Sequence, residues 1–259
     1  MKKAQFLDWR SRAAIGESYE KFIEAQNHLW EERLLGLAPD TLIVSRHQPT
    51  ITLGARSLKE QLPHLRPLPS EWLEEPDDEK LFLRTKQFLW DQYSINLVRC
   101  ERGGSVWYHD IGVLQFSVVA ELESGFPSEI VYPLEETLFQ TLTALSVPVE
   151  RSPERDRDQS FIGIWSRGKK LGAIGVRIRK MGKKKISQFG AALNVHPYRV
   201  CLRLIDPCGI KGVEATSIEE VMGKHYERTG VRIVPTFLRK FQEVFGMEFP
   251  QSTFTEFLY

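Results

Sequence analysis

The 259-residue chain is poor in cysteine, carries almost no net charge and has no long apolar run. Its three cysteines, Cys100, Cys201 and Cys208, form no CxxC pair. They therefore predict neither a disulfide framework nor a zinc site, and we expect reduced thiols in a cytoplasmic protein. The net charge of +1 and the absence of a known nucleic-acid motif give no reason to expect nucleic acid as a partner.

No stretch approaches the roughly 18 apolar residues of a transmembrane helix, so we expect no membrane segment. Asp8 and Arg10 interrupt the apolar core that a signal peptide needs. Hydrophobic residues make up 42% of the chain and charged residues 27%, which is typical of a soluble globular protein.

Apolar residues at helical spacing predict helices at 18–36, 133–147 and 234–246. Ser18 is a candidate N-cap and Gly36 a candidate end of the first helix. Pro133 suits the first position of the second helix, because proline is tolerated there.

Apolar and alternating runs predict strands at 41–47, 50–56, 94–100, 113–122, 161–180 (two strands) and 186–195. The first two surround a Gln-Pro turn. Residues 60–80 read as a surface excursion, and 152–160 as a charged loop. Because no linker is evident, we expect one α+β domain over 1–259 with a C-terminal helical extension at about 223–259.

The first stretch that could carry chemistry is RGGSVWYH, 102–109. The pair Gly103-Gly104 lets a ligand approach the backbone, and free amides there could hold an oxyanion. A tight turn at the end of a strand explains the glycines equally well. His109 alone is more often a structural histidine than a catalytic one.

The second stretch is GKKLGAIG, 168–175, and the third is FGAALNV, 189–195. Neighbouring residues of a strand point in opposite directions. If Ile174 and Val176 face inward, Lys170 shares their side and becomes the candidate pocket lysine, and Lys169 points outward. An exposed basic turn is the alternative. The small residues of the third stretch leave room for a ligand or for close backbone packing.

The fourth stretch is DPCGIKG, 206–212, which places Cys208 on a loop between proline and glycine. A nearby lysine favours the thiolate and can move its proton. Taken alone, a buried and inert cysteine explains Cys208 better. Cys100 and Cys201 lie in apolar stretches, and we expect both to be inert core residues.

In their order, these stretches resemble the lipoyl (octanoyl) transferases of the lipoate/biotin protein ligase superfamily. The resemblance covers about residues 15–222. The pieces that carry it are QPTITLG, RGGSVWYH, GIW with KKLGAIG, GAALNV, and DPCGI with TS. The resemblance implies a single domain with a mixed β-sheet flanked by helices, and an acyl chain held in a tunnel beside the sheet.

The resemblance also implies a ping-pong acyl transfer without metal or cofactor. Cys208 would attack octanoyl-acyl carrier protein to form an acyl-enzyme. Lys170 would favour the thiolate of Cys208, shuttle its proton and later help to deprotonate the acceptor lysine. The acceptors would be lipoyl domains of 2-oxo acid dehydrogenases or the glycine cleavage H protein.

Three segments correspond to the family's acyl-binding residues. They are Arg102, Gly103, Gly104, Ser105, Val106, Trp107, Tyr108 and His109; Ala173, Ile174 and Gly175; and Gly190, Ala191 and Ala192.

Two positions depart from the family pattern. Asp110 follows His109 as in the related lipoate ligases, and Phe189 stands where the family usually has histidine. An ATP-dependent lipoate ligase and a non-catalytic paralogue that binds acyl carriers are therefore alternatives. A ligase activates its acyl group as an adenylate and does not need Cys208, so the presence of both Cys208 and Lys170 favours the transferase.

A basic turn is the last notable feature. Its six cations are Arg177, Arg179, Lys180, Lys183, Lys184 and Lys185. The resemblance implies acidic acyl carriers and acidic lipoyl domains, which such a turn could steer electrostatically. A solvated turn without a partner is an equally good explanation.

Overall fold

The computed structural model describes residues 2–10, 16–249 and 254–255. Its main sheet has eight strands in the described part of the chain, in the order β10-β1-β2-β6-β9-β8-β7, with β11 also pairing β1. The strands are β1 (Lys2–Trp9), β2 (Asp40–Ser45), β6 (Val113–Val119), β7 (Gly163–Ser166), β8 (Lys169–Met181), β9 (Lys184–Asn194), β10 (Met247–Glu248) and β11 (Phe254–Thr255). The partners of β1 run parallel to it and the other pairs are antiparallel.

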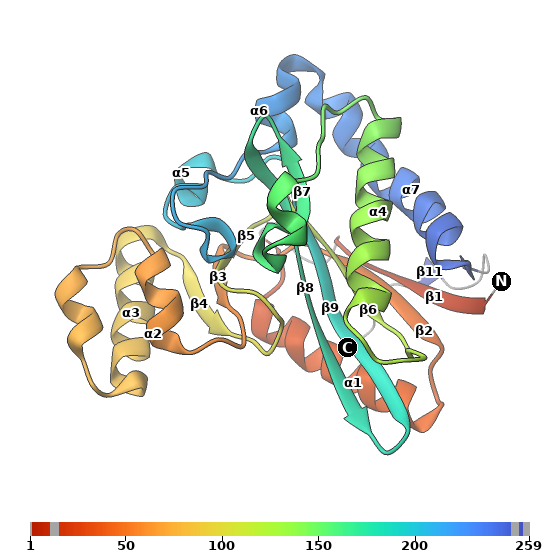
Figure 1. Cartoon of the computed structure of the whole chain (residues 1–259), viewed down its shortest axis with the longest axis horizontal. Coiled ribbons are helices and arrows are strands. Elements are labelled where there is room, and N and C mark those ends of the chain that lie inside the picture. The colour runs from red at the N-terminus through yellow and green to blue at the C-terminus, as the bar shows by residue number, and fades with distance from the viewer. Residues whose placement is uncertain (1, 11–15, 250–253, 256–259) are drawn as a thin grey trace.

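A second sheet, of order β4-β3-β5, stands beside the first. Its strands are β3 (Thr50–Leu53), β4 (Asn96–Arg99) and β5 (Trp107–His109). Four helical elements form a lobe with it, at the left of Figure 1: α2 (Leu58–Gln61), η1 (Leu62–His64), η2 (Ser70–Glu74) and α3 (Asp78–Tyr93).

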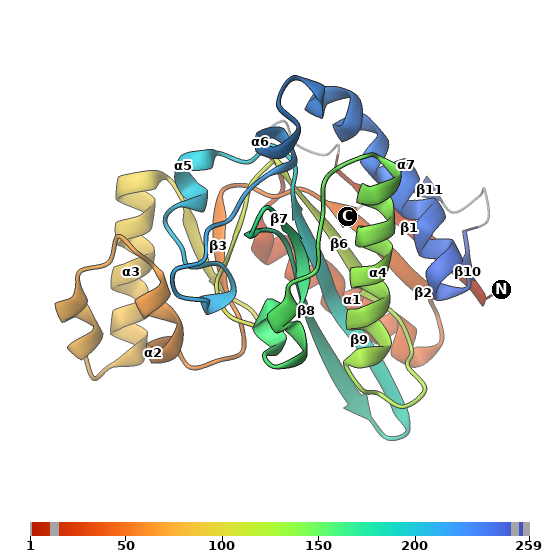
Figure 2. The same ribbon diagram turned by 45° about the horizontal axis from the view of Figure 1, so that its top comes forward.

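Helices cover both faces of the main sheet (Figures 1 and 2). The pair α4 (Ser128–Ala144) and α7 (Tyr226–Phe245) packs on one face, where Phe116 stacks on Phe237 at 3.8 Å between ring centroids. On the other face lies α1 (Tyr19–Leu35), which buries Phe22 and Trp30. The predicted single α+β domain with a mixed sheet flanked by helices is confirmed.

Short helical elements make up most of the remaining connections. They are η3 (Pro153–Asp156), η4 (Gln159–Phe161), α5 (Arg199–Leu202), η5 (Pro207–Gly209), α6 (Ile218–Met222) and η6 (Gly223–His225). None of the helices in the described part of the chain has the length and hydropathy to span a bilayer.

The first predicted helix is confirmed with both of its ends. Ser18 Oγ accepts from the amide of Lys21, and Gly36 closes α1 with a φ of 77°. The second prediction was wrong about the start: α4 begins at Ser128, so Pro133 lies inside the helix. Burial of apolar residues along one face of α4 outweighs the hydrogen bond that Pro133 cannot donate. The third helix is confirmed, although α7 begins eight residues earlier than predicted.

The predicted strands 41–47 and 50–56 exist but do not pair with each other. The first, β2, joins the main sheet, and the second, β3, joins the small sheet. Much of the predicted surface excursion at 60–80 is helical, and α3 occupies a stretch for which no element was predicted. A narrow stripe of Leu81, Thr85 and Leu89 is all that α3 buries, which explains why its periodicity is faint. The strand β1 was likewise not predicted.

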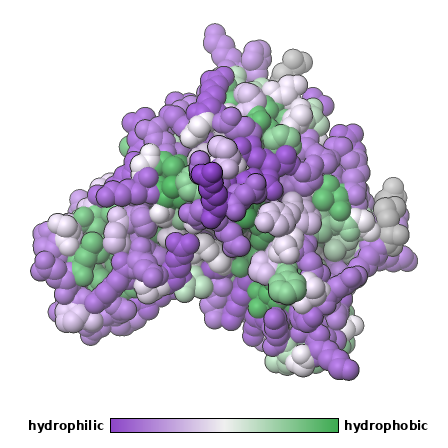
Figure 3. Space-filling view, in the orientation of Figure 1, coloured by the Kyte–Doolittle hydropathy of each residue, from purple (hydrophilic) through white to green (hydrophobic). Residues whose placement is uncertain are grey.

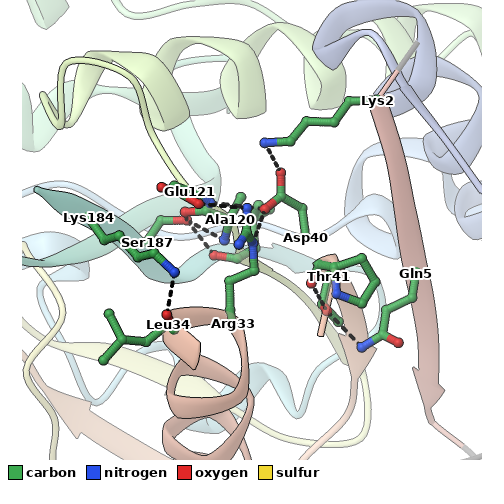
Figure 4. A network of polar contacts seen from close by, with 12 residues as sticks. Lys2, Gln5, Arg33, Leu34, Asp40, Thr41, Ala120, Glu121, Lys184 and Ser187 are labelled. Carbon is green, nitrogen blue, oxygen red and sulfur yellow. Dashed lines mark hydrogen bonds and ion pairs between the residues drawn. The ribbon is translucent and has the colours of Figure 1, made fainter. Parts of the chain in front are cut away.

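A buried carboxylate ties four elements together near one end of the sheet (Figure 4). Asp40, at the start of β2, accepts from Arg33 Nε at 2.6 Å and from the amide of Glu121 at 3.0 Å. Lys2 Nζ from β1 lies 2.5 Å from its other oxygen. This network fixes the end of α1 against the sheet.

We predict that Asp40→Asn lowers the free energy of unfolding by about 2 kcal/mol, because it removes the buried carboxylate that pairs with both Lys2 and Arg33 and leaves Arg33 only the partly exposed Glu121. Glu243→Gln is the matched control, since its ion pair with Lys240 is on the surface and is worth less than about 1 kcal/mol. Urea unfolding of the two variants measures the difference. Equal stabilities would contradict a structural role for the network.

Candidate active site

A narrow pocket lies between β8, β9 and the loop before β5. The centre of a water-sized sphere can reach only about 30 Å³ of it. Cys208 lines it. The predicted acyl-binding residues that line it are Arg102, Gly103, Gly104, Trp107, His109, Ala173, Ile174, Gly175, Gly190, Ala191 and Ala192. The structure thus brings the cysteine and parts of all three predicted segments together.

Ser105, Val106 and Tyr108 do not line the pocket. Val106 and Tyr108 are buried in the core of the small-sheet lobe. The hydroxyl of Ser105 is buried, has no hydrogen-bond partner among the described residues and lies against Gly209. Ser105 and Val106 support the loop that carries Cys208, since the Val106 carbonyl accepts from the amide of Cys208 at 3.0 Å.

The glycines of the Arg102–Gly104 loop serve a close backbone contact. The amide of Gly103 donates to the carbonyl of Val176 on β8 at 2.9 Å. A Cβ added to Gly175 would lie 2.7 Å from the carbonyl oxygen of Gly103. The Gly103 amide is therefore engaged in joining the loop to β8, and it is not free to hold an oxyanion as the sequence had suggested.

Arg102 is buried beside the pocket and is held by the small sheet. Its guanidinium donates to the carbonyl of Thr52 at 3.1 Å and to the Thr52 hydroxyl at 2.7 Å. The same hydroxyl lies 3.3 Å from Nε2 of His109. Arg102 therefore has a fixed position at the wall of the pocket.

Cys208 has a backbone conformation that is rare for a residue with a side chain. Its φ is 59° and its ψ is 15°, in the left-handed region, and Gly209 follows with a φ of 75°. Strain of this kind costs on the order of 1–3 kcal/mol and is concentrated at functional sites. The side chain is half-buried and packs against Trp107, Val113, Ala173 and Ala192.

Lys170, the predicted pocket lysine, is fully buried but is not among the described residues that line the pocket, and Lys169 is partly exposed in an ion pair with Glu214 at 2.7 Å. The reasoning about faces was wrong. A register shift in the β7–β8 pairing leaves Leu171 without a partner, so alternation is broken between Lys170 and Ile174. Ile174 packs toward α4, and Lys170 lies on the other side, over the ring of Trp165.

The ammonium of Lys170 donates to the carbonyl of Ser160 in η4. Among the described residues it has no hydrogen bond to Cys208. Cys208 belongs to η5, and η4 and η5 lie against each other. Lys170 is therefore hydrogen-bonded to one turn, η4, and Cys208 belongs to the adjoining turn, η5.

Pattern reasoning missed two polar residues that line the pocket, Tyr19 and Gln115. Gln115 Nε2 donates to the hydroxyl of Tyr19 at 3.3 Å. The ring of Tyr19 contacts both His47 and His109, with centroids 4.7 and 4.8 Å away, and the two imidazoles lie 5.8 Å from each other. Tertiary packing alone brings α1 to this place, so no local pattern could reveal it.

Both histidines are fully enclosed and neutral. Burial lowers the pKa of His47 to about 3. Burial, together with the nearby His47 and Arg102, lowers the pKa of His109 well below its usual range. The wall of the pocket around Tyr19 is therefore polar and uncharged except for Arg102.

The two residues that depart from the family pattern, Asp110 and Phe189, lie in different parts of the structure. Asp110 lies outside the pocket, where its carboxylate accepts from the amides of Gly112 and Tyr198 and from the Tyr108 hydroxyl. Burial raises its pKa. Phe189 does line the pocket, with a φ of 63°, so an aromatic ring stands where the family usually has an imidazole.

Cys100 and Cys201 are buried free thiols, as predicted, and burial raises the pKa of each. In residues 2–10, 16–249 and 254–255, no three His, Cys, Asp or Glu side chains come together as a metal-binding group.

Comparison with known proteins gives the same family as the motifs. The model of the lipoyl protein ligase A/B catalytic domain matches residues 18–241. The chain belongs to this family. It is 28% identical to an octanoyltransferase of Syntrophobacter fumaroxidans over 228 residues, 87% of this chain and 86% of the relative. It is 32% identical to an octanoyltransferase of Chloroflexus aggregans over 206 residues, 78% of this chain and 79% of the relative.

Solved structures of lipoyl protein ligases share the fold. A lipoate-protein ligase A bound with ATP superposes with a TM-score of 0.63 at 18% identity, covering 98% of this chain and 90% of that one. The bipartite lipoate protein ligase of Thermoplasma acidophilum superposes with a TM-score of 0.58 at 15% identity, covering 99% and 89%.

We predict that the free energy of unfolding decreases as the pH falls from 7.5 to 5.5. In the unfolded chain His47 and His109 take up protons near pH 6.5, whereas in the folded chain they stay neutral, so acid favours unfolding. Each should contribute about 1.4 kcal/mol over this interval. Urea unfolding at both pH values measures the loss.

His47→Gln should remove about half of that loss, whereas His225→Gln, which changes an exposed side chain, should leave it unaltered. A pH dependence unaffected by His47→Gln would contradict the neutral buried state of this histidine.

Proposed function

We propose that this protein transfers an octanoyl group from acyl carrier protein to a lysine of lipoyl domains, with Cys208 carrying the acyl group in between. The relatives named octanoyltransferase support the octanoyl group and the reaction class. The observation that carries the cysteine's role is its position: a half-buried thiol in a strained conformation on the wall of a narrow pocket.

In the first half-reaction Sγ of Cys208 attacks the thioester carbonyl. The bond between the acyl carbon and the donor's sulfur breaks, and the donor thiol leaves with the proton that Cys208 gave up. In the second half-reaction the acceptor amine attacks the new thioester, the bond between the acyl carbon and Sγ breaks as the amide forms, and Cys208 takes up the proton that the amine gives up. A thioester is higher in energy than an amide, so neither step needs ATP.

Lys170 is proposed as the group that favours the thiolate and moves the proton. Its ammonium now bonds to Ser160 in η4, and rotation about its flexible stem would direct it toward the adjoining turn η5. Trp165 and the surrounding burial keep water away from it. A cation next to a thiol raises the thiolate fraction at neutral pH.

Ala173, Gly175 and Gly190–Ala192 are proposed to hold the acyl chain. They are small, so the backbones of β8 and β9 themselves form the wall of the pocket. The cavity is so narrow that a medium chain would have to displace side chains of its lining. Tyr19, Trp107 and Phe189 are bulky lining residues, and they are the expected determinants of chain length.

The ligase alternative rests on Asp110, because an aspartate directly after His109 resembles the pattern of the ligases. Its carboxylate is already occupied by three donors within the protein, so it serves the turn before β6.

All three cysteines are free, which fits the cytosol as the proposed compartment.

We predict that incubation with octanoyl-acyl carrier protein, without ATP, adds one octanoyl group to the protein by intact mass. Cys208→Ala should abolish the adduct, because no other cysteine faces the pocket, while Cys100→Ala and Cys201→Ala should retain it. A persistent adduct in Cys208→Ala would refute the nucleophile. Acylation of a lipoyl domain only with ATP would indicate a ligase, and neither reaction a non-catalytic paralogue.

We also predict that Lys170→Met slows alkylation of Cys208 by iodoacetamide at pH 7 about tenfold, because loss of the cation leaves less thiolate. Methionine fills most of the volume of the lysine side chain against Trp165, so the fold should persist. The control is Lys240→Ala on α7, which should react like the wild type. Equal rates for Lys170→Met and the wild type would rule out the dyad.

A further inference from the structure

Beside the loop that carries Cys208 there is a second, larger cleft of about 460 Å³. Its lining residues are Arg66, Lys169, Arg199, Leu202, Arg203, Glu214, Ala215 and Glu220. Four cations and two carboxylates line it, and Asp206 and Glu219 balance the count by pairing with Arg66 and Arg199. Lys169 is paired with Glu214, so the positive charge open to a partner is that of Arg203 and the weakly paired Arg199. We propose that this cleft docks the acidic surface of the acyl donor's carrier protein. This inference rests on the proposed function.

The cleft adjoins the catalytic loop on two sides. Arg66 Nε donates to the carboxylate of Asp206 at 2.9 Å, two residues before Cys208. Lys169 precedes Lys170 in β8, and the backbone of Lys170 pairs with Ala215 on the cleft wall. A carrier seated in the cleft would therefore stand next to both proposed catalytic residues.

Arg199 on α5 and Arg203, which directly follows α5, are available to a partner. Among the described residues Arg203 has no ion pair, and its side chain is exposed. Arg199 lies 3.8 Å from Glu219, with both side chains partly exposed, a geometry that contributes little to stability. Both residues can therefore bind an anionic partner without disrupting the fold.

Apolar groups flank the cations, as at most protein interfaces. Tyr198 is 56% exposed and Val200 67% exposed. In Figure 3, apolar and strongly hydrophilic residues lie side by side over the region where Figure 1 shows α5. The surface therefore combines positive charge with apolar anchors, which suits an acidic protein surface better than a free phosphate group.

The basic turn between β8 and β9 is less suitable than the sequence suggested. Arg177 is paired with Glu101, and Arg179 stacks on Trp30 at 3.6 Å. Lys184 donates to the carbonyl of Leu34 (Figure 4), and Lys185 to the carbonyls of Glu123 and Ser124.

Of the six cations in the turn, Lys180 and Lys183 alone lack a partner within the described chain. In both ribbon views the tip of the hairpin lies at the opposite end of the molecule from α5 (Figures 1 and 2). A partner bound there would be far from Cys208.

The two substrates place different demands on distance. A thioester donor carried on a long flexible arm can dock its protein body to one side of the thiol. An acceptor lysine has only its own short side chain, so the acceptor domain must sit at the mouth of the pocket itself. A cleft beside the catalytic loop therefore suits the donor.

The test is the binding of octanoyl-acyl carrier protein to the non-reactive Cys208→Ala protein at low salt. Adding Arg199→Glu and Arg203→Glu should raise Kd at least about tenfold, and the difference should shrink in about 1 M salt. The matched control adds Lys180→Glu and Lys183→Glu, which should leave Kd within about twofold. An unchanged Kd in the α5 variant, or a loss confined to the hairpin variant, would overturn the proposal.

A second measurement uses the protein with Cys208 intact and follows acylation from two donors. Arg199→Glu with Arg203→Glu should slow acylation from the carrier protein, but not from the octanoyl thioester of N-acetylcysteamine, which is neutral and has no carrier. Equal losses with both donors would mean damage to the active site and would overturn the proposal. So would normal acylation with slowed transfer to a lipoyl domain, because the cleft would then dock the acceptor.

The two measurements separate this inference from the proposed function. If the wild type binds the carrier through α5 but forms no adduct with either donor, the acyl-enzyme chemistry fails and the docking surface stands. If the wild type forms the adduct but the charges of Arg199 and Arg203 do not affect binding of the carrier, the acyl-enzyme chemistry stands and the docking surface fails.

Discussion

The contact between the Arg102–Gly104 loop and β8 is the constraint on which the rest of the site depends. The hydrogen bond from Gly103 to Val176 joins the small sheet to the main sheet, and it forms only because Gly175 leaves the space that a side chain would take. The same loop supplies one wall of the pocket, and β8 supplies the other. The pocket is therefore the seam between the two sheets, and it would not exist if either sheet moved away.

This dependence explains why the sequence is informative at the pocket. A seam between backbones requires small residues on both sides, and these appear as RGG before β5, as GAIG in β8 and as GAALN in β9. The loop of the proposed nucleophile is recognisable for a similar reason, since the left-handed backbone at residue 209 favours glycine. By contrast, α3 buries only a thin stripe of residues and β1 is interrupted by charges, so neither has a pattern that stands out from a surface segment.

Two features of the site could not be predicted because they arise between elements. The face of Lys170 depends on the register shift opposite Ile164 and Trp165, and a sequence that alternates regularly gives no indication of where a strand slips. The polar surroundings of Tyr19, which Gln115 and the two histidines provide, come from separate elements that meet only after α1 packs on the sheet. The cleft is likewise assembled from distant segments, whereas most cations of the basic turn, conspicuous in the sequence, are engaged by neighbouring groups.

The narrowness of the pocket suits the proposed chemistry. In that mechanism the acyl-enzyme is a thioester that has to persist until the acceptor arrives, and water competes with the acceptor amine for it. A slot between two backbones, with neutral histidines and little free volume, leaves almost no room for water once an acyl chain fills it. Apart from Arg102, the described residues that line the pocket carry no charge. Charged side chains line the cleft outside, where they can act on a protein partner at longer range. The pocket has to exclude water, whereas the cleft has to expose its charged side chains to a partner. The loop of Cys208 lies between the two.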